Sequence, residues 1–352
     1  MAAAFVVSFL TSPNRNASLP WTIMGLVGSL GLIVFSGPGQ TWVRRFRSSA
    51  AATWLFLAFG GIALAVALFA TDWPAHKLAW LERLYGSLPS VQSLPWWNVK
   101  GLQANQTGGI LAVCTAFAFA VVSTRTMPRG VRWLAGLLAV MGSTVVFMTG
   151  SRAALGGLML AGLVVAIIRT RKWLSVWGTG LAASGWLLLA SGRLPALARL
   201  ILRDESLEVK MVARLDIWLA AFKGIEDHFF TGIGLGVFNQ VMPFRYPYET
   251  VGLSYSVSQA HNVFLDVALC LGIPGLLGFL LVILGIVVSA IHGLRSDISG
   301  DATSLGILAS LIVYLVFGIT DSISFAVPTS LIIWIWGTVL CGTSNCPALV
   351  QR

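Results

Sequence analysis

The amino-acid sequence predicts an all-α membrane protein, a helix bundle with about nine spans. Hydrophobic residues make up 57% of its 352 residues and charged residues only 10%, whereas a soluble domain has roughly 25% charged residues. Several apolar runs also reach the roughly 20 residues that an α-helix needs to cross a bilayer. We expect these helices to form a single transmembrane domain over residues 1–352.

Nine apolar segments account for the predicted spans. They cover about 20–36, 51–70, 106–124, 131–149, 153–168, 173–191, 263–290, 303–320 and 327–343. The chain begins with a short apolar run that lacks a basic start, so it is a poor signal peptide. We expect this run to be the stump of a helix or a short interfacial segment.

Basic residues in short loops predict the orientation. The arginine-rich loops at 44–47, 125–132 and 169–172 fall on one side of the membrane if the spans alternate. Because Lys and Arg are enriched in cytoplasmic loops, this side is predicted to be cytoplasmic. Topology then explains the net charge of +10, and no nucleic-acid partner is expected.

Three segments remain on the predicted outer face. They are 71–105, the tight turn 148–155 and the extracytoplasmic loop 193–262. A loop as long as 193–262 is usually functional, so it is expected to bear the catalytic region. The four cysteines lie in or beside apolar segments, and no His, Cys, Asp or Glu group has metal-ligand spacing. No metal or other cofactor is therefore expected.

Arg152 lies in the turn "TGSRAAL" between the fourth and fifth spans. The turn is too short to carry the side chain far into water, and a guanidinium at that depth is costly unless it has a partner. Two interpretations stay open. Arg152 either extends to lipid headgroup phosphates or forms a fixed cation for an anionic ligand at the outer interface.

Arg214 begins the segment "RLDIWLAAFKGIEDHFF", whose apolar positions recur with helical spacing. This pattern predicts an amphipathic helix over 214–230 that lies along the outer membrane surface. At the start of that helix, Arg214 adds its charge to backbone N–H groups that favour anions. The alternative is an ion pair with Asp216 or Glu208. The following "TGIGLGVF" predicts a helix stop and a flexible turn.

His261 precedes the seventh span and is followed by Asn262. A histidine titrates near neutral pH and can act as a general base, but it can equally cap the helix or lie at the interface. Asp266 either orients His261 or lies on another face of the helix. A carboxylate inside a span is itself a functional indication.

Loop counting places Arg152, Arg214 and His261 on the same predicted face. Two arginines and one base suit a diphosphate donor whose lipid tail stays in the bilayer. The arginines would neutralise the phosphates and stabilise the leaving group. The histidine would deprotonate an incoming hydroxyl. Gln106, Asn262 and Asp266 are weaker candidates for support.

Three blocks of the sequence resemble the O-antigen ligase / O-antigen polymerase superfamily. They are "TGSRAAL", "RLDIWLAAFKGIEDHFFTGIGLGVF" and "AHNVFLDVALCLGIPGLLGFLL". In addition, "ANQTGGILA" (104–112) resembles an Asn-centred motif of many members, so the resemblance covers roughly residues 104–290. It implies a multi-pass GT-C-type glycosyltransferase of polysaccharide biosynthesis that is metal-independent and inverting.

The resemblance also implies the reaction and its residues. Members transfer glycans from undecaprenyl diphosphate to an acceptor hydroxyl at the outer face of the cytoplasmic membrane. Arg152 and Arg214 match the two diphosphate-binding arginines, and His261 matches the catalytic base. The implied partners are the lipid-linked glycan, a glycan or lipid acceptor, and membrane lipids.

The chain differs from many members in its number of spans, and a second function stays open. Members often have about twelve spans, whereas nine are predicted here, which fits an N-terminally shortened chain or a compact relative. The superfamily also includes proteins labelled as bicarbonate transporters, so a small-anion transporter is the alternative. Transporter sites lie near the bilayer midplane. The candidate residues here gather at one face, which favours glycan transfer.

Overall fold

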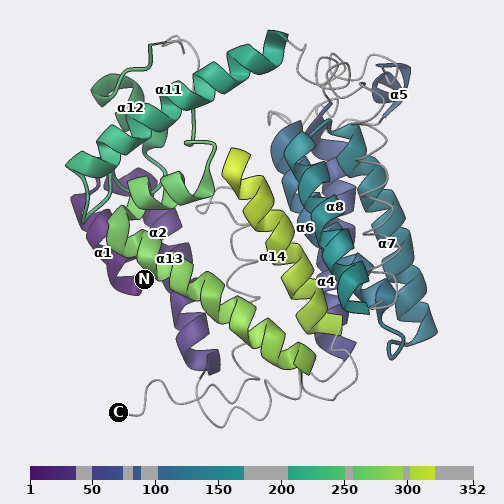
Figure 1. The fold of residues 1–352 in the computed structure, drawn as a ribbon. Coiled ribbons are helices and arrows are strands. Elements are labelled where there is room, and N and C mark those ends of the chain that lie inside the picture. The colour runs from purple at the N-terminus through teal and green to yellow at the C-terminus, as the bar shows by residue number, and fades with distance from the viewer. Residues whose placement is uncertain are drawn as a thin grey trace, which may run out of the picture.

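The computed structural model is a bundle of helices with short helices and loops covering one end (Figure 1). It describes residues 1–36, 50–73, 82–88, 102–169, 205–249, 257–295 and 302–321. Seven helices in these ranges are long and apolar enough to cross a membrane. The chain is therefore a polytopic helical membrane protein. Two predicted spans, 173–191 and 327–343, lie outside the described residues.

The described elements follow one another in a simple order. The helices are α1 (Ala2–Thr11), α2 (Arg15–Ser36), α4 (Ala50–Ala70), α5 (Glu82–Ser87), α6 (Ala104–Ser123), α7 (Arg129–Met148), α8 (Arg152–Arg169), α11 (Glu205–Asp227), α12 (Phe238–Arg245), α13 (Val263–Arg295) and α14 (Ala302–Thr320). The two-residue strands β1 (Thr71–Asp72) and β2 (Leu102–Gln103) pair in parallel. The seven predicted spans that fall on described residues are confirmed as α2, α4, α6, α7, α8, α13 and α14.

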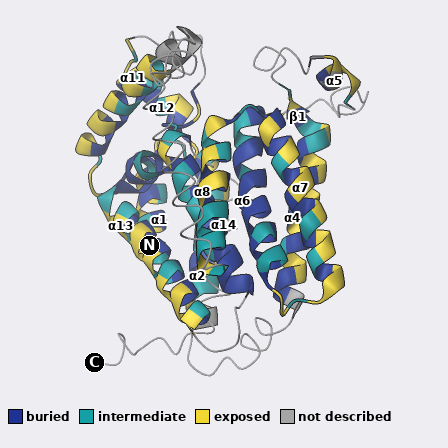
Figure 2. Cartoon of the chain, turned by 45° about the vertical axis from the view of Figure 1, so that its right-hand side comes forward, coloured by how far each residue is buried: buried dark blue, intermediate teal, exposed yellow. Residues whose placement is uncertain are grey.

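The helices form two groups. In the first group, α6 lies at the centre and packs against α4, α7, α8 and α14. Figure 2 shows α6 buried over most of its length, whereas α7 and α13 expose residues along their outer sides. In the second group, α13 packs against α1 and α11. The two groups meet where α13 contacts α14.

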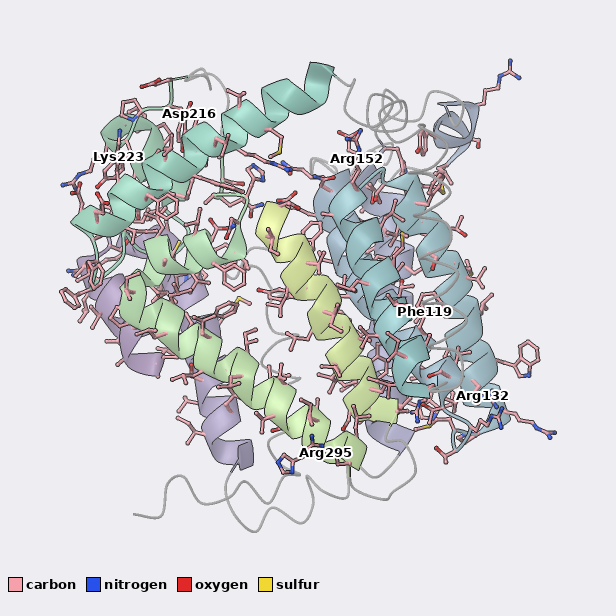
Figure 3. All side chains as sticks on the ribbon, in the orientation of Figure 1. Phe119, Arg132, Arg152, Asp216, Lys223 and Arg295 are labelled. Carbon is pink, nitrogen blue, oxygen red and sulfur yellow. The ribbon has the colours of Figure 1, made fainter. Side chains whose placement is uncertain are left out.

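The charged residues distinguish the two ends of the bundle. Figure 3 shows Arg132 and Arg295 at one end, and Arg152, Asp216 and Lys223 at the other. This is the arrangement that alternating spans predict. The end that carries Arg152 and α11 is called the α11 end below.

Helix α13 is broken at Gly272, which has φ 71° and ψ 175°. The sequence "LGIPG" explains the break, because Pro274 lacks an N–H and its ring clashes with the carbonyl four residues earlier. Glycine alone adopts such a positive φ without steric cost. The predicted seventh span is therefore two helical segments joined at an angle rather than one continuous helix.

The loop after α11 fills this break. Four hydrogen bonds satisfy the backbone groups that the break frees: Ile233 N to Leu269 O (2.8 Å), Gly234 N to Cys270 O (3.3 Å), Ser8 Oγ to Cys270 O (2.6 Å) and Ile273 N to Phe229 O (2.8 Å). In a membrane such groups need partners within the protein. The loop is thereby fixed to α13.

The helix stops before the turn at 231–238, as predicted. Gly232, Gly234 and Gly236 in this turn all have positive φ and lie against packed atoms. A Cβ at Gly232 would meet the carbonyl of Cys270. Glycine at these positions is therefore required for the close packing of the turn against its neighbours.

We expect Gly272→Ala to destabilise the protein by about 2 kcal/mol or more, because alanine is strained at this φ. Its Cβ would also lie 2.7 Å from the carbonyl carbon of Phe230. Thermal unfolding in detergent checks this. Gly285→Ala is the matched control, because it lies on the same helix with no atom within 4 Å of the added Cβ. Equal melting temperatures for the two variants would contradict the packing described.

Candidate functional site

The carboxylate of Asp321 is the centre of the candidate site. Asp321 directly follows α14, and only 4% of its side chain is exposed. Its Oδ1 lies 3.0 Å from His261 Nδ1 and accepts a hydrogen bond from Gln259 Nε2 at 3.2 Å. Its Oδ2 accepts from Asn105 Nδ2 at 3.0 Å. Residues from α6, from the segment before α13 and from the end of α14 therefore converge on one carboxylate.

Asp321 is held in its ionised form. Burial opposes ionisation, but hydrogen bonds from His261 and Asn105 and the charges of His261 and Arg214 outweigh it and lower the pKa of Asp321. An ionised carboxylate only accepts hydrogen bonds. The Nδ1 of His261 must therefore be the donor in this pair.

This contact indicates which ring nitrogen of a neutral His261 carries the proton. With the proton on Nδ1, a neutral imidazole carries its lone pair on Nε2. His261 is 26% exposed, in contrast to the buried carboxylate behind it. The arrangement is that of a general base whose ring is oriented by an acid and whose second nitrogen remains available to accept a proton.

The backbone at His261 is unusual and is fixed from both sides. His261 has φ +53°, which is uncommon for a residue other than glycine. The preceding residue, Ala260, donates its N–H to Asp266 Oδ1 at 2.6 Å and accepts at its carbonyl from Trp218 Nε1 at 2.9 Å. Asp266 therefore holds the backbone before His261. The carboxylate that contacts the imidazole is Asp321, whereas Asp266 contacts the backbone before it.

Asn262 supports the site through helix capping. Its Oδ1 accepts from the N–H groups of Phe264 and Leu265, at the start of α13, and its Nδ2 donates to Ile319 O at 3.1 Å. A side-chain acceptor at this position satisfies N–H groups that have no partner within the helix. Asn262 thus joins the start of α13 to the end of α14, on either side of the His261–Asp321 pair.

Arg214 lies on α11, close enough to Asp321 for its charge to lower the pKa of that carboxyl group. The helix begins at Glu205, earlier than predicted, and its side toward the protein buries Ile217, Ala221 and Ile225. Packing of this side against α13 carries Arg214 to the site.

Arg152 is the exposed first residue of α8. The turn before it packs against the second turn of α6, since a Cβ at Gly108 would lie 2.5 Å from Thr149 Oγ1 and 3.2 Å from Ser151 Cβ. Asn105 lies one turn earlier on α6. Because Asn105 donates to Asp321, Arg152 lies at the same end of the bundle as the Asp321 cluster. Figure 3 shows Arg152 at the end that also carries Asp216 of α11.

Three members of the Asp321 cluster were not predicted from the sequence. Asp321 was not singled out, although a carboxylate at the end of an apolar run is a recognisable signal. Asn105 lies in the motif "ANQTGG", where Gln106 was predicted to give support, but it is Asn105 that donates to Asp321. Gln259 lies two residues before His261 and carried no signal of its own.

Among the described residues, no group of three or more His, Cys, Asp or Glu could hold a metal ion.

Residues 137–280 match the family model described as O-antigen ligase. The match supports the similarity of this segment to the O-antigen ligase / O-antigen polymerase superfamily. Members of the family are glycosyltransferase-like enzymes of polysaccharide biosynthesis. None of the curated proteins compared with the chain matches it.

The O-antigen ligase segment contains Arg152, Arg214 and His261. Asn105, on α6, and Asp321, directly after α14, lie outside it. The fold thus adds Asp321, the partner of His261, and Asn105, which donates to Asp321, to the part of the chain that the family model covers.

The lowered pKa of Asp321 predicts a pH dependence of stability. The ordinary value is 3.8. Because the folded value lies below it, ionised Asp321 stabilises the fold above pH 3.8, and this contribution is lost as the pH falls through the folded value. We expect the melting temperature of the wild type to exceed that of Asp321→Asn, with a difference that shrinks from about pH 5 to about pH 2. A difference that grows on acidification would contradict this.

Proposed function

We propose that the protein transfers a glycan from undecaprenyl diphosphate to an acceptor hydroxyl at the outer face of the cytoplasmic membrane. The observation that carries this proposal is the His261–Asp321 pair, with Nδ1 and Oδ1 3.0 Å apart and Arg214 within electrostatic range. A proton acceptor beside a fixed cation is what displacement of a diphosphate requires.

The reaction is a single displacement at the anomeric carbon. His261 Nε2 takes the proton of the acceptor hydroxyl as its oxygen bonds to the anomeric carbon. The bond from that carbon to the diphosphate oxygen breaks, and the diphosphate leaves with both electrons. Attack opposite the leaving group inverts the configuration. The buried Asp321 carboxylate stabilises the imidazolium that forms, and the proton then passes to solvent.

Arg152 and Arg214 bind the diphosphate in this proposal. Guanidinium groups form short, charge-assisted and often bidentate hydrogen bonds with phosphate oxygens. Arg152 is the first residue of α8, where the exposed N–H groups of the first turn also favour an anion. The two cations stabilise the negative charge that develops on the leaving group. This is the role that a metal ion has in other phosphate-binding sites.

The charge distribution supports the assignment of the outer face. Arg125, Arg129 and Arg132 lie in the loop and first turn between α6 and α7, opposite the α11 end. Every carboxylate residue of the sequence before Asp297 lies in a segment predicted to be outside or, as Asp266 does, near the start of α13 at the α11 end. By the positive-inside rule, the α11 end faces away from the cytoplasm.

One feature favours the alternative of a small-anion transporter. A helix broken within a membrane span, like α13 at Gly272, is a common element of transporter sites. Here, however, the carbonyls of Leu269 and Cys270 accept hydrogen bonds from the chain's own loop and from Ser8. The chain itself fills the break, and the candidate residues gather at one end of the bundle. Glycan transfer is therefore the better-supported function.

The direct test is to incubate purified protein with an undecaprenyl diphosphate glycan and candidate acceptors in the presence of a chelator. We expect the wild type to form product. We expect the rate of product formation to fall by about 100-fold or more in His261→Gln, Arg152→Gln and Arg214→Gln. Arg245→Gln is the matched control, because Arg245 is exposed on α12. Failure of every acceptor, together with bicarbonate uptake into vesicles, would support the transporter. A requirement for a divalent ion would contradict the arginine mechanism.

A second test distinguishes the roles of the two carboxylates near His261, those of Asp321 and Asp266. Asp321→Asn keeps the shape of the side chain but removes the charge that holds the Nδ1 proton, so we expect turnover to fall about 100-fold or more. Asp266→Asn keeps an oxygen that can accept from Ala260 N–H, so turnover should stay within about fivefold of the wild type. Equal losses in the two variants would show that the pair does not orient the base.

A further inference from the structure

We infer that Trp218 is a positioning residue that couples the diphosphate-binding helix α11 to the base His261. The inference rests on the proposed function, because it assigns Arg214 to the diphosphate and His261 to the acceptor proton. It is carried by a separate contact, the hydrogen bond from Trp218 Nε1 to the carbonyl of Ala260 at 2.9 Å.

Both polar groups of Ala260 are held by side chains. Its N–H donates to Asp266 Oδ1 at 2.6 Å, and its carbonyl accepts from Trp218. That carbonyl belongs to the peptide group that leads into His261. Trp218, on α11, therefore fixes the peptide group that leads into His261, and Asp266, on α13, fixes the peptide group before it.

The direction of the His261 side chain depends on the plane of the peptide group that leads into it. A φ of +53° is uncommon for a histidine, and such a conformation persists only where the surrounding contacts define it. Asp321 holds the imidazole itself, and Asn262 holds the following residue to α14. Trp218 supplies the contact from α11, so the alignment of the base depends on the position of that helix.

Trp218 and Arg214 are four residues apart on α11 and so lie on the same face of the helix. The charge of Arg214 is felt at Asp321, and the indole of Trp218 reaches Ala260. A diphosphate bound at Arg214 restrains α11, and Trp218 passes this restraint to the peptide group before His261. Donor binding thereby aligns the base before the acceptor arrives.

A kinetic experiment tests the positioning role. Trp218→Phe keeps an aromatic ring but removes the N–H donor, and β-(3-benzothienyl)alanine at position 218 keeps the shape of the indole with sulfur in place of the N–H. We expect both to lower kcat by about 10- to 100-fold, while the donor KM stays within about threefold. Trp133→Phe is the matched control, because Trp133 is 80% exposed on α7. Wild-type kcat in the isosteric variant would overturn the inference.

Hydrogen exchange tests the coupling without relying on activity. In the full-length protein in detergent, we expect backbone N–H groups of 257–262 to exchange at least about tenfold faster in the isosteric variant than in the wild type. Inorganic pyrophosphate, used as the probe, should slow this exchange in the wild type but not in the variant. Equal exchange rates, or equal slowing in both proteins, would overturn the coupling.

The two experiments distinguish failure of the inference from failure of the proposed function. A wild type that forms no product contradicts glycan transfer, and the exchange rates then still decide whether Trp218 holds the segment 257–262. A wild type that forms product, with variants equally active, contradicts only the role of Trp218.

Discussion

The candidate site depends on one buried charge, the carboxylate of Asp321. A buried carboxylate is costly unless hydrogen bonds and opposite charges compensate for its lost hydration. Asn105, Gln259 and His261 supply those bonds, and Arg214 supplies part of the charge. These partners come from both helix groups. The same interactions that keep Asp321 ionised therefore hold the groups together and orient the imidazole of His261.

The rest of the fold holds the partners of Asp321 in place. The break in α13 at Gly272 receives the loop that follows α11, and the backbone hydrogen bonds between them place α11 against the start of α13. Arg214 and Trp218 reach the site only because α11 is held there. On the other side, α6 brings Asn105 to Asp321 and packs against the turn before Arg152. A membrane bundle thus brings these charged groups together at its α11 end.

Much of this architecture follows from local sequence signals. Seven spans could be predicted because apolar runs of sufficient length have few other solutions, and "LGIPG" contains the signal for a break. Arg152 stands out because a guanidinium in so short a turn is costly, Arg214 because it begins an amphipathic segment, and His261 because it precedes a span. The pairing of Asp321 with His261 could not be predicted, because sixty positions separate them. The sequence left open whether Asp266 orients His261 or lies on another face of the helix. The left-handed backbone conformation of His261 directs its ring toward the end of α14, and no local sequence pattern predicts this conformation.

The central claim is that Asp321 orients the imidazole of His261. The tautomer of the neutral His261 ring tests this claim most directly. The chain has four histidines, so ¹⁵N NMR of histidine-labelled protein, with His261→Gln to assign the signal, can resolve this ring. At a pH where the ring is neutral, we expect the proton on Nδ1 and a non-protonated Nε2, because Asp321 accepts from Nδ1. A proton on Nε2 would contradict the account, since Asp321 would then not orient the base.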